Sequence, residues 1–130
     1  MSRAIIVCQT CKFSAQCKTG ADGKTGGQHL TQHLETILAG RSDVVIQKQD
    51  CLWACSDHCN VILSDTERFS YLAGRFEPGE PAARAIVAWF DRHGESTTGL
   101  VPFREWPEEM RGHFIARIPW QGSPDQTDGT

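Results

Sequence analysis

Hydrophobic residues recur along this chain with two different spacings, which predict strands and helices in turn. The run at residues 4–7 is continuous and apolar, as is typical of a buried strand, and we expect this strand to end at Cys8. Residues 9–26 are polar and rich in glycine, so we interpret them as a long loop. From Gln28 the apolar residues follow helical spacing up to Gly40, which predicts a helix that ends there. The apolar stripe of this helix comprises Leu30, Leu34, Ile37 and Leu38.

The next predicted elements are a single strand, then a two-stranded hairpin, then a second helix. Residues 44–46 begin a β-branched strand that runs toward Cys51. Residues 61–63 and 69–73 have strand character on either side of a polar turn, which predicts a hairpin. Pro81 opens the second helix, because its missing N–H costs nothing in a first turn, and Gly94 is the expected C-terminal cap.

The predicted order of elements is β-α-β-β-β-α. A parallel pair of strands joined by a right-handed helical crossover, then a hairpin and a covering helix, is the thioredoxin-like arrangement. We therefore predict an α/β fold of this kind with a four-stranded mixed sheet. Residues 1–95 form that domain. Residues 96–120 form an extension packed on it, because they hold scattered aromatics and prolines, and residues 121–130 form a disordered tail.

Composition narrows the classes of function. The 130 residues are 39% hydrophobic and 22% charged, which suits one small soluble domain. The formal charge of −3 leaves no basic stripe for phosphates, so we do not expect nucleic acid as a partner. Apolar runs are too short to span a membrane or to form a signal-peptide core, and we expect a cytoplasmic protein.

Six cysteines are the informative excess in this composition. In a reducing cytoplasm a disulfide framework is not expected. Cys8, Cys11 and Cys17 form one group, and Cys51, Cys55 and Cys59 form another. Each group begins where a predicted strand ends, and the ends of two parallel strands meet at one edge of a sheet. The two loops that leave this edge can therefore supply two thiolates each to a single metal centre.

The spacing of the cysteines leaves two kinds of centre open. Zinc prefers Cys-x2-Cys pairs on tight turns, a spacing that the Cys8–Cys11 pair matches and that the Cys51–Cys55 pair, with three intervening residues, fits less well. Iron–sulfur clusters also take four thiolates and accept more varied spacing, because the cluster is larger than one ion. A thiol–disulfide oxidoreductase is disfavoured, because a long loop separates Cys11 from the first predicted helix and so from its activating dipole.

Two motifs resemble known families. The segments Val7-Cys8-Gln9-Thr10-Cys11-Lys12 and Asp50-Cys51-Leu52-Trp53-Ala54-Cys55 resemble a bacterial family known as predicted metal-binding proteins, whose members often sit among cobalamin-synthesis genes. The C-terminal Gly99-Leu100-Val101-Pro102-Phe103-Arg104 extends this resemblance. Residues 51–74 are also similar to the thioredoxin-like 2Fe–2S ferredoxins. These resemblances imply a 2Fe–2S electron carrier, with a role in cobalamin or cobalt metabolism and a homodimeric state.

The resemblance also implies a set of ligands. Cys8, Cys51 and Cys55 match the ferredoxin pattern position by position. For the fourth ligand the ferredoxin spacing favours Cys17, whereas the predicted metal-binding family carries a counterpart of Cys11, and we assign Cys11. Alternate ligands or neighbours of the cluster are Cys17, Cys59 and His58.

These observations predict a ferredoxin-like electron-transfer protein with an unidentified redox partner protein and no catalytic residues of its own. The alternative is a zinc- or cobalt-binding module without a redox role. A thiol–disulfide oxidoreductase is third.

Overall fold

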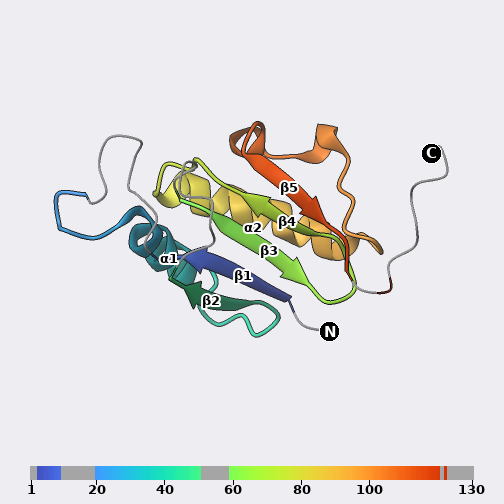
Figure 1. The fold of residues 1–130 in the computed structure, drawn as a ribbon, viewed down its shortest axis with the longest axis horizontal. Coiled ribbons are helices and arrows are strands. Elements are labelled where there is room, and N and C mark those ends of the chain that lie inside the picture. Colours follow the sequence, from blue (N-terminus) through green and yellow to red (C-terminus); the bar gives the residue numbers. More distant parts are fainter. Residues whose placement is uncertain (1–2, 10–19, 51–58, 121, 123–130) are drawn as a thin grey trace.

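The fold is built on a crossover that joins two parallel strands at the start of the chain. The structure is a computed structural model that describes residues 3–9, 20–50, 59–120 and 122. Strand β1 (Arg3–Cys8) pairs in parallel with β2 (Val45–Gln49), and helix α1 (Gly26–Ile37) connects them (Figure 1). The β-branched residues of β1 lie at the centre of the sheet, where they pack on both neighbours.

Helix α1 begins two residues before the predicted start at Gln28. Its N-cap is Thr25, whose hydroxyl accepts a hydrogen bond from the Gln28 backbone N–H at 3.2 Å, while the Gln28 side chain accepts from the Thr25 N–H at 2.9 Å. This reciprocal pair is a capping box, which satisfies two backbone donors that a helix start would leave without partners. The pattern Thr25-x-x-Gln28 was present in the sequence and would have predicted the correct start.

The hairpin of β3 (Val61–Asp65) and β4 (Ser70–Ala73) adds two strands on the other side of β1. Strand β3 is antiparallel to β1, with Val61 opposite Val7, and β4 is antiparallel to β3. Helix α2 (Glu80–Glu95) follows, with Pro81 in its first turn as predicted. The predicted order β-α-β-β-β-α is therefore confirmed for residues 3–95 of the described chain.

The prediction of a four-stranded sheet was wrong, because the extension contributes a fifth strand. After two single-turn 3₁₀ helices (Phe103–Glu105 and Glu108–Met110), strand β5 (Phe114–Ile118) pairs antiparallel with β4. The sheet order is β2-β1-β3-β4-β5. The sequence of β5 lacks the polar–apolar alternation of a half-buried strand, which is why it did not predict a strand. The pairing of β5 with β4 is also irregular, because its register shifts beside Leu72 and Ala73.

Gly94 is not the C-terminal cap that we predicted. It lies inside α2, which ends one residue later. A Cβ atom at this position would lie 2.7 Å from the guanidinium of Arg3. Glycine therefore leaves room for the Arg3 guanidinium beside α2 and does not stop the helix.

Both helices pack on one face of the sheet and against each other (Figure 1). The buried core lies between this face and the helices, and its largest residues include Trp89, Phe76, Phe90 and Ile5. The strand pairing places Ile5, Val7 and Leu63 on this helix-covered face.

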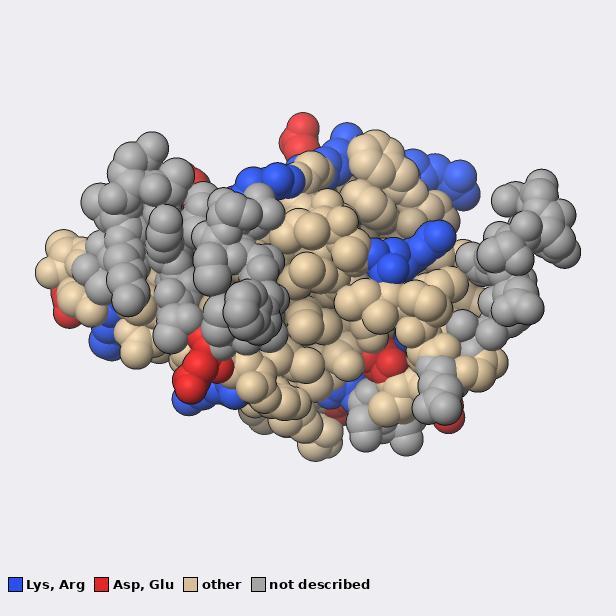
Figure 2. Space-filling view, in the orientation of Figure 1, with Lys and Arg blue, Asp and Glu red and all other residues tan. Residues whose placement is uncertain are grey.

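Among the residues that the structure describes, the opposite face of the sheet carries no helix, and the strand residues that point to it are uncharged. These residues are Ala4, Ile6, Cys8, Val45, Gln47, Gln49, Ile62, Ser64, Ser70, Leu72, Ala116 and Ile118. We call this set the open face. Figure 2 views the molecule from this side: uncharged residues fill its middle, and most Lys, Arg, Asp and Glu lie toward its margins.

A buried polar network closes the end of the sheet opposite to Cys8. The carboxylate of Asp65 accepts hydrogen bonds from Arg3 at 3.1 Å and from Arg68 at 2.9 Å. The ring of His93 is fully buried, with Nδ1 3.0 Å from Arg3 Nη2 and Nε2 2.6 Å from the Phe69 carbonyl oxygen. Because arginine only donates and a carbonyl only accepts, His93 is neutral and carries its proton on Nε2.

Within the described residues, no helix combines the length and the apolar character needed to cross a membrane.

Candidate metal centre

Cys8 occupies the last position of β1, at the edge where β1 and β2 both end. Its register partner is Gln49, the last residue of β2. Its side chain is 2% exposed, and its Sγ donates a hydrogen bond to the Asp50 carbonyl oxygen at 3.6 Å. The thiol of the first cysteine group therefore contacts the backbone directly before Cys51. This contact agrees with the expectation that parallel strand ends bring the two groups to one edge.

Cys59 lies at the same edge, two residues before β3 begins at Val61. Asn60, the residue after Cys59, accepts a hydrogen bond on its carbonyl oxygen from the backbone N–H of Cys8 at 3.1 Å. Cys59 is fully buried and has a φ of +54°. This left-handed conformation costs an L-residue with a Cβ about 1–2 kcal/mol, and such local strain is typical of functional sites.

The other predicted ligands fall outside the described residues. Cys11 and Cys17 belong to residues 10–19, which follow Gln9, whereas Cys51, Cys55 and His58 belong to residues 51–58, which join Asp50 to Cys59. The described ends of both segments meet at one edge, because the Gln9 N–H donates to the Gln49 carbonyl oxygen at 2.7 Å. Among the residues with described positions, no group of three or more His, Cys, Asp or Glu is arranged to hold a metal ion.

The first turn of α1 packs directly on the backbone of Cys8. A Cβ atom at Gly27 would lie 1.8 Å from the Cys8 carbonyl oxygen, so only glycine allows the helix to come this close. The Thr25 hydroxyl donates to the Gln9 carbonyl oxygen at 2.5 Å, and Gln9 Nε2 donates to the Thr31 hydroxyl at 2.9 Å. These contacts hold the chain on both sides of Cys8 in place.

Gly27, Thr25 and Thr31 are residues of the site that our reading of the sequence missed. The capping pattern at Thr25 was the available signal, whereas the close approach of Gly27 depends on tertiary packing and leaves none in the sequence.

The thiol of Cys8 and helix α1 lie on opposite faces of the sheet. Strand residues alternate in direction, so Cys8 points to the same side as Ala4 and Ile6, whereas α1 packs on the side of Ile5 and Val7. The helix N-terminus therefore faces the carbonyl of Cys8 and not its sulfur.

Comparison with known protein families gives a match that covers the residues of this edge. The model of the family described as "Protein of unknown function (DUF1636)" matches residues 5–120. The chain belongs to this family. No curated protein and no solved structure matches the chain.

The DUF1636 match includes all six cysteines and also β5. The family model therefore spans the extension as well as the edge that carries Cys8 and Cys59.

Proposed function

We propose that this protein holds a 2Fe–2S cluster on cysteine thiolates and passes single electrons to a partner protein. The observation that carries the proposal is that Cys8, Asp50 and Cys59, which border the two cysteine-bearing loops, lie at one sheet edge. Cys8 ends β1 there, Asp50 precedes the segment with Cys51 and Cys55, and Cys59 lies two residues before β3 begins. Thiolates from separate loops at one edge suit a cluster larger than a single ion.

The proposed ligands are Cys8, Cys11, Cys51 and Cys55. The alternates are Cys17, Cys59 and His58. Cys59 is a strong alternate, because it is buried beside the backbone of Cys8. A buried sulfur at this position can bind iron or can contact the sulfur of another ligand, and such contacts adjust the reduction potential.

A 2Fe–2S cluster, when bound, supplies one-electron chemistry. The chain's contribution is to exclude water and to hold the ligand backbone rigid. Cys8 and Cys59 are almost completely buried, and the packing of Gly27 on the Cys8 carbonyl leaves the end of β1 no room to move toward α1. A site that reorganises little favours electron transfer over substrate chemistry.

We also propose that the domain is thioredoxin-like. Its support is the order β2-β1-β3-β4 with a parallel first pair and both helices on one face. A thiol–disulfide oxidoreductase is a weaker proposal, because such enzymes place the reactive thiol at a helix N-terminus. Here the first turn of α1 faces the Cys8 carbonyl, and the thiol points to the other side of the sheet.

The second candidate is a zinc or cobalt site without a redox role. It is favoured by the Cys8-x2-Cys11 spacing directly after β1, which is typical of zinc-binding turns. One measurement separates the two candidates. Protein purified without oxygen should be red-brown, should contain iron and sulfide, and should lose its visible absorption on reduction with dithionite. A colourless protein with one zinc or cobalt per chain, which takes up no cluster on reconstitution, would refute the iron–sulfur proposal.

Serine variants test the ligands. Cys8→Ser, Cys51→Ser and Cys55→Ser should each lose the visible absorption of the cluster. Of Cys11→Ser, Cys17→Ser and Cys59→Ser, only Cys11→Ser should do so, and the other two serve as matched controls. If all three of these variants keep a normal cluster, Cys11 is not the fourth ligand. Circular dichroism confirms that each variant is folded.

We further propose that the protein is a cytoplasmic homodimer that serves cobalt or cobalamin metabolism, as the resemblance of its motifs implies. The open face supports the dimer. Val45 and Ile118 on this face are 61% and 41% exposed, and the centre of the sheet contributes Ile6, Ile62 and Leu72. An uncharged apolar face of this extent is typical of an interface, and two copies meet on it without charge repulsion.

A further inference from the structure

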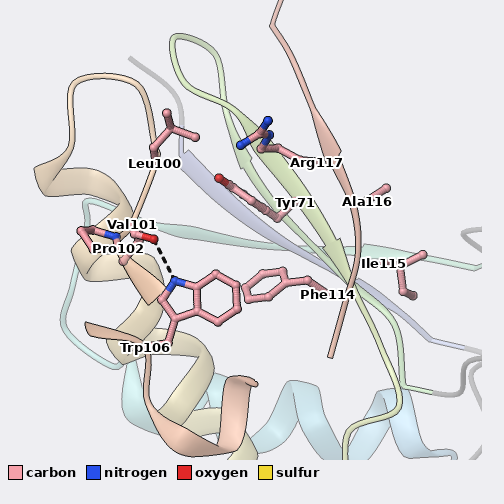
Figure 3. Close-up of a pocket in the computed structure, with 9 residues that line it drawn as sticks. All are labelled: Tyr71, Leu100, Val101, Pro102, Trp106, Phe114, Ile115, Ala116 and Arg117. Atoms are coloured by element: carbon pink, nitrogen blue, oxygen red, sulfur yellow. Dashed lines mark hydrogen bonds between the residues drawn. The ribbon is translucent and has the colours of Figure 1, made fainter. Parts of the chain in front are cut away.

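A hollow lined by apolar side chains lies between the last two strands and the segment that precedes the first 3₁₀ helix. Its volume is about 710 Å³, which is within the range of small-molecule sites. Tyr71 of β4 and Phe114 and Arg117 of β5 form one side, and Leu100, Val101 and Trp106 form the other (Figure 3). Apart from Tyr71, the described residues that line the hollow all belong to residues 100–117.

The hollow is separate from the proposed metal centre. Strand β5 is three positions away from β1 in the sheet order, which corresponds to roughly 14 Å. The hollow also opens on the helix-covered side of the sheet, because Tyr71 and Arg117 point there, whereas Cys8 points to the open face.

The polar atoms of the aromatic walls are already used by the protein itself. Trp106 Nε1 donates to the Val101 carbonyl oxygen at 2.9 Å, and the Tyr71 hydroxyl donates to the Gly99 carbonyl oxygen at 3.0 Å (Figure 3 shows the first of these bonds). The rings of Trp106 and Phe114 pack with their centres 4.8 Å apart. The walls therefore present ring faces and aliphatic groups, and they are held rigidly.

One cation stands in this apolar wall. The guanidinium of Arg117 lies beside Tyr71 in Figure 3, and it packs over the ring of Phe69 at 4.8 Å. None of the residues that line the hollow is acidic, and within the described part of the chain no ion pair includes Arg117. The hollow thus combines apolar walls with a single positive charge.

We propose that this hollow binds a small amphipathic carboxylate. The apolar body of the ligand lies against Trp106 and Phe114, and its carboxylate pairs with Arg117, whose planar guanidinium matches a carboxylate with two parallel hydrogen bonds. Leu100 and Ile115, each 39% exposed, stand at the rim, where a bound ligand would cover them. The Tyr71 hydroxyl already donates its hydrogen bond to the Gly99 carbonyl oxygen. Arg117, the charged residue among the described lining residues, is therefore the group that selects the charge of the ligand.

A charge-reversed pair of probes tests this proposal. The purified protein is titrated with 4-phenylbutyrate and with 4-phenylbutylamine, which share a body and differ in the sign of their charge. The signal is the indole N–H resonance of Trp106 in proton–nitrogen NMR spectra, assigned by its loss in Trp106→Phe. The carboxylate should shift this resonance in a saturable manner, and the amine should bind at least about tenfold more weakly, as expected for the loss of one charge-assisted contact.

Arg117→Gln should weaken the binding of 4-phenylbutyrate about tenfold and should not weaken the binding of the amine, because the variant no longer repels a cation. Arg111→Gln is the matched control, because Arg111 also packs over an aromatic ring, that of Phe103, yet lies outside the hollow. Equal binding of the two probes, an Arg117→Gln variant with unchanged affinity, or a Trp106 resonance that does not move at 10 mM carboxylate would each overturn the proposal. Well-dispersed spectra show that the variants are folded, and the result does not depend on which metal the cysteines bind.

Discussion

Gly27 allows helix α1 to pack directly on the backbone of Cys8. A methyl group there would lie 1.8 Å from the Cys8 carbonyl oxygen. This oxygen belongs to the backbone and cannot shift unless the end of β1 moves. We expect Gly27→Ala to lower the free energy of unfolding by roughly 3 kcal/mol, at the upper end for an overpacked site. The variant should also retain less metal after purification, because α1 and the end of β1 have to separate.

Gly79→Ala is the matched control for this prediction. Gly79 is the N-cap of α2, and a Cβ atom there would lie 3.7 Å from Pro81, an ordinary contact. It should change stability by less than about 1 kcal/mol. Urea denaturation and metal analysis measure both effects, and a Gly27→Ala protein with normal stability and normal metal content would contradict the prediction.

His93 should make the protein less stable in mild acid. Burial lowers the pKa of His93, and its neighbour Arg3 opposes a second positive charge. An unfolded chain takes up a proton on histidine near pH 6.5, whereas the folded protein keeps His93 neutral to lower pH. Unfolding therefore binds a proton in this window, and stability should fall as the pH drops below about 6.5, by up to about 1.4 kcal/mol per pH unit.

His93→Gln should flatten this dependence, because the amide can still donate to the Phe69 carbonyl but does not titrate. The measurement is the free energy of unfolding in urea at pH 7.5, 6.5 and 5.5. An equal slope in the two proteins would show that burial of His93 does not control the acid response.

At the scale of single elements, the N-terminus of α1 shows how much one helix cap contributes to stability. Thr25 both caps the helix and donates to the Gln9 carbonyl next to Cys8. Thr25→Ala should cost about 1 kcal/mol of stability, as expected for a lost N-cap. Thr25→Ser keeps the hydroxyl and should recover most of this loss in thermal or urea denaturation. If Thr25→Ala is as stable as Thr25→Ser, the cap contributes nothing.

The elements that the sequence predicted correctly are those with a strong local pattern. These elements include the apolar run of β1, the apolar stripe of α2 and the polar turn between β3 and β4. In each case the local pattern of apolar and polar residues is enough to predict the structure. Strand β5 was missed because four of its five residues are exposed and it is defined by pairing with β4 rather than by its own pattern. Gly94 was misread because its role depends on Arg3, which is distant in the sequence.

The candidate site was predictable to a similar extent. The position of Cys8 at a strand end followed from hydrophobic pattern alone, and the meeting of β1 and β2 at one edge followed from the parallel crossover. The left-handed conformation of Cys59 and the contact of Gly27 with Cys8 were not predictable, because both depend on how distant segments pack. The assignments of Cys11, Cys17, Cys51, Cys55 and His58 remain predictions.

At the scale of the whole molecule, the open face should determine the oligomeric state. The sheet has five strands of four to six residues, so this face covers roughly 400–500 Å² per copy at ordinary strand spacings. Two copies packed face to face would bury roughly 800–1,000 Å², which is at the lower limit for a specific interface. We therefore expect a dimer that dissociates with a Kd on the order of 10 μM.

Ile62→Glu tests this expectation, because Ile62 lies on the central strand β3 and points to the open face. A carboxylate in the middle of an apolar interface has no partner there, so the variant should be monomeric at concentrations where the unmodified protein is dimeric. Val45→Glu, at the exposed margin of the same face, should weaken the dimer even if Ile62→Glu folds poorly. Gln32→Glu makes the same change of charge on exposed α1 surface and should leave the dimer intact. Analytical ultracentrifugation from 1 to 200 μM distinguishes the 14.4 kDa monomer from the dimer. A monomer throughout this range, or a dimer that survives both glutamates on the open face, would mean that this face does not join two copies of the chain.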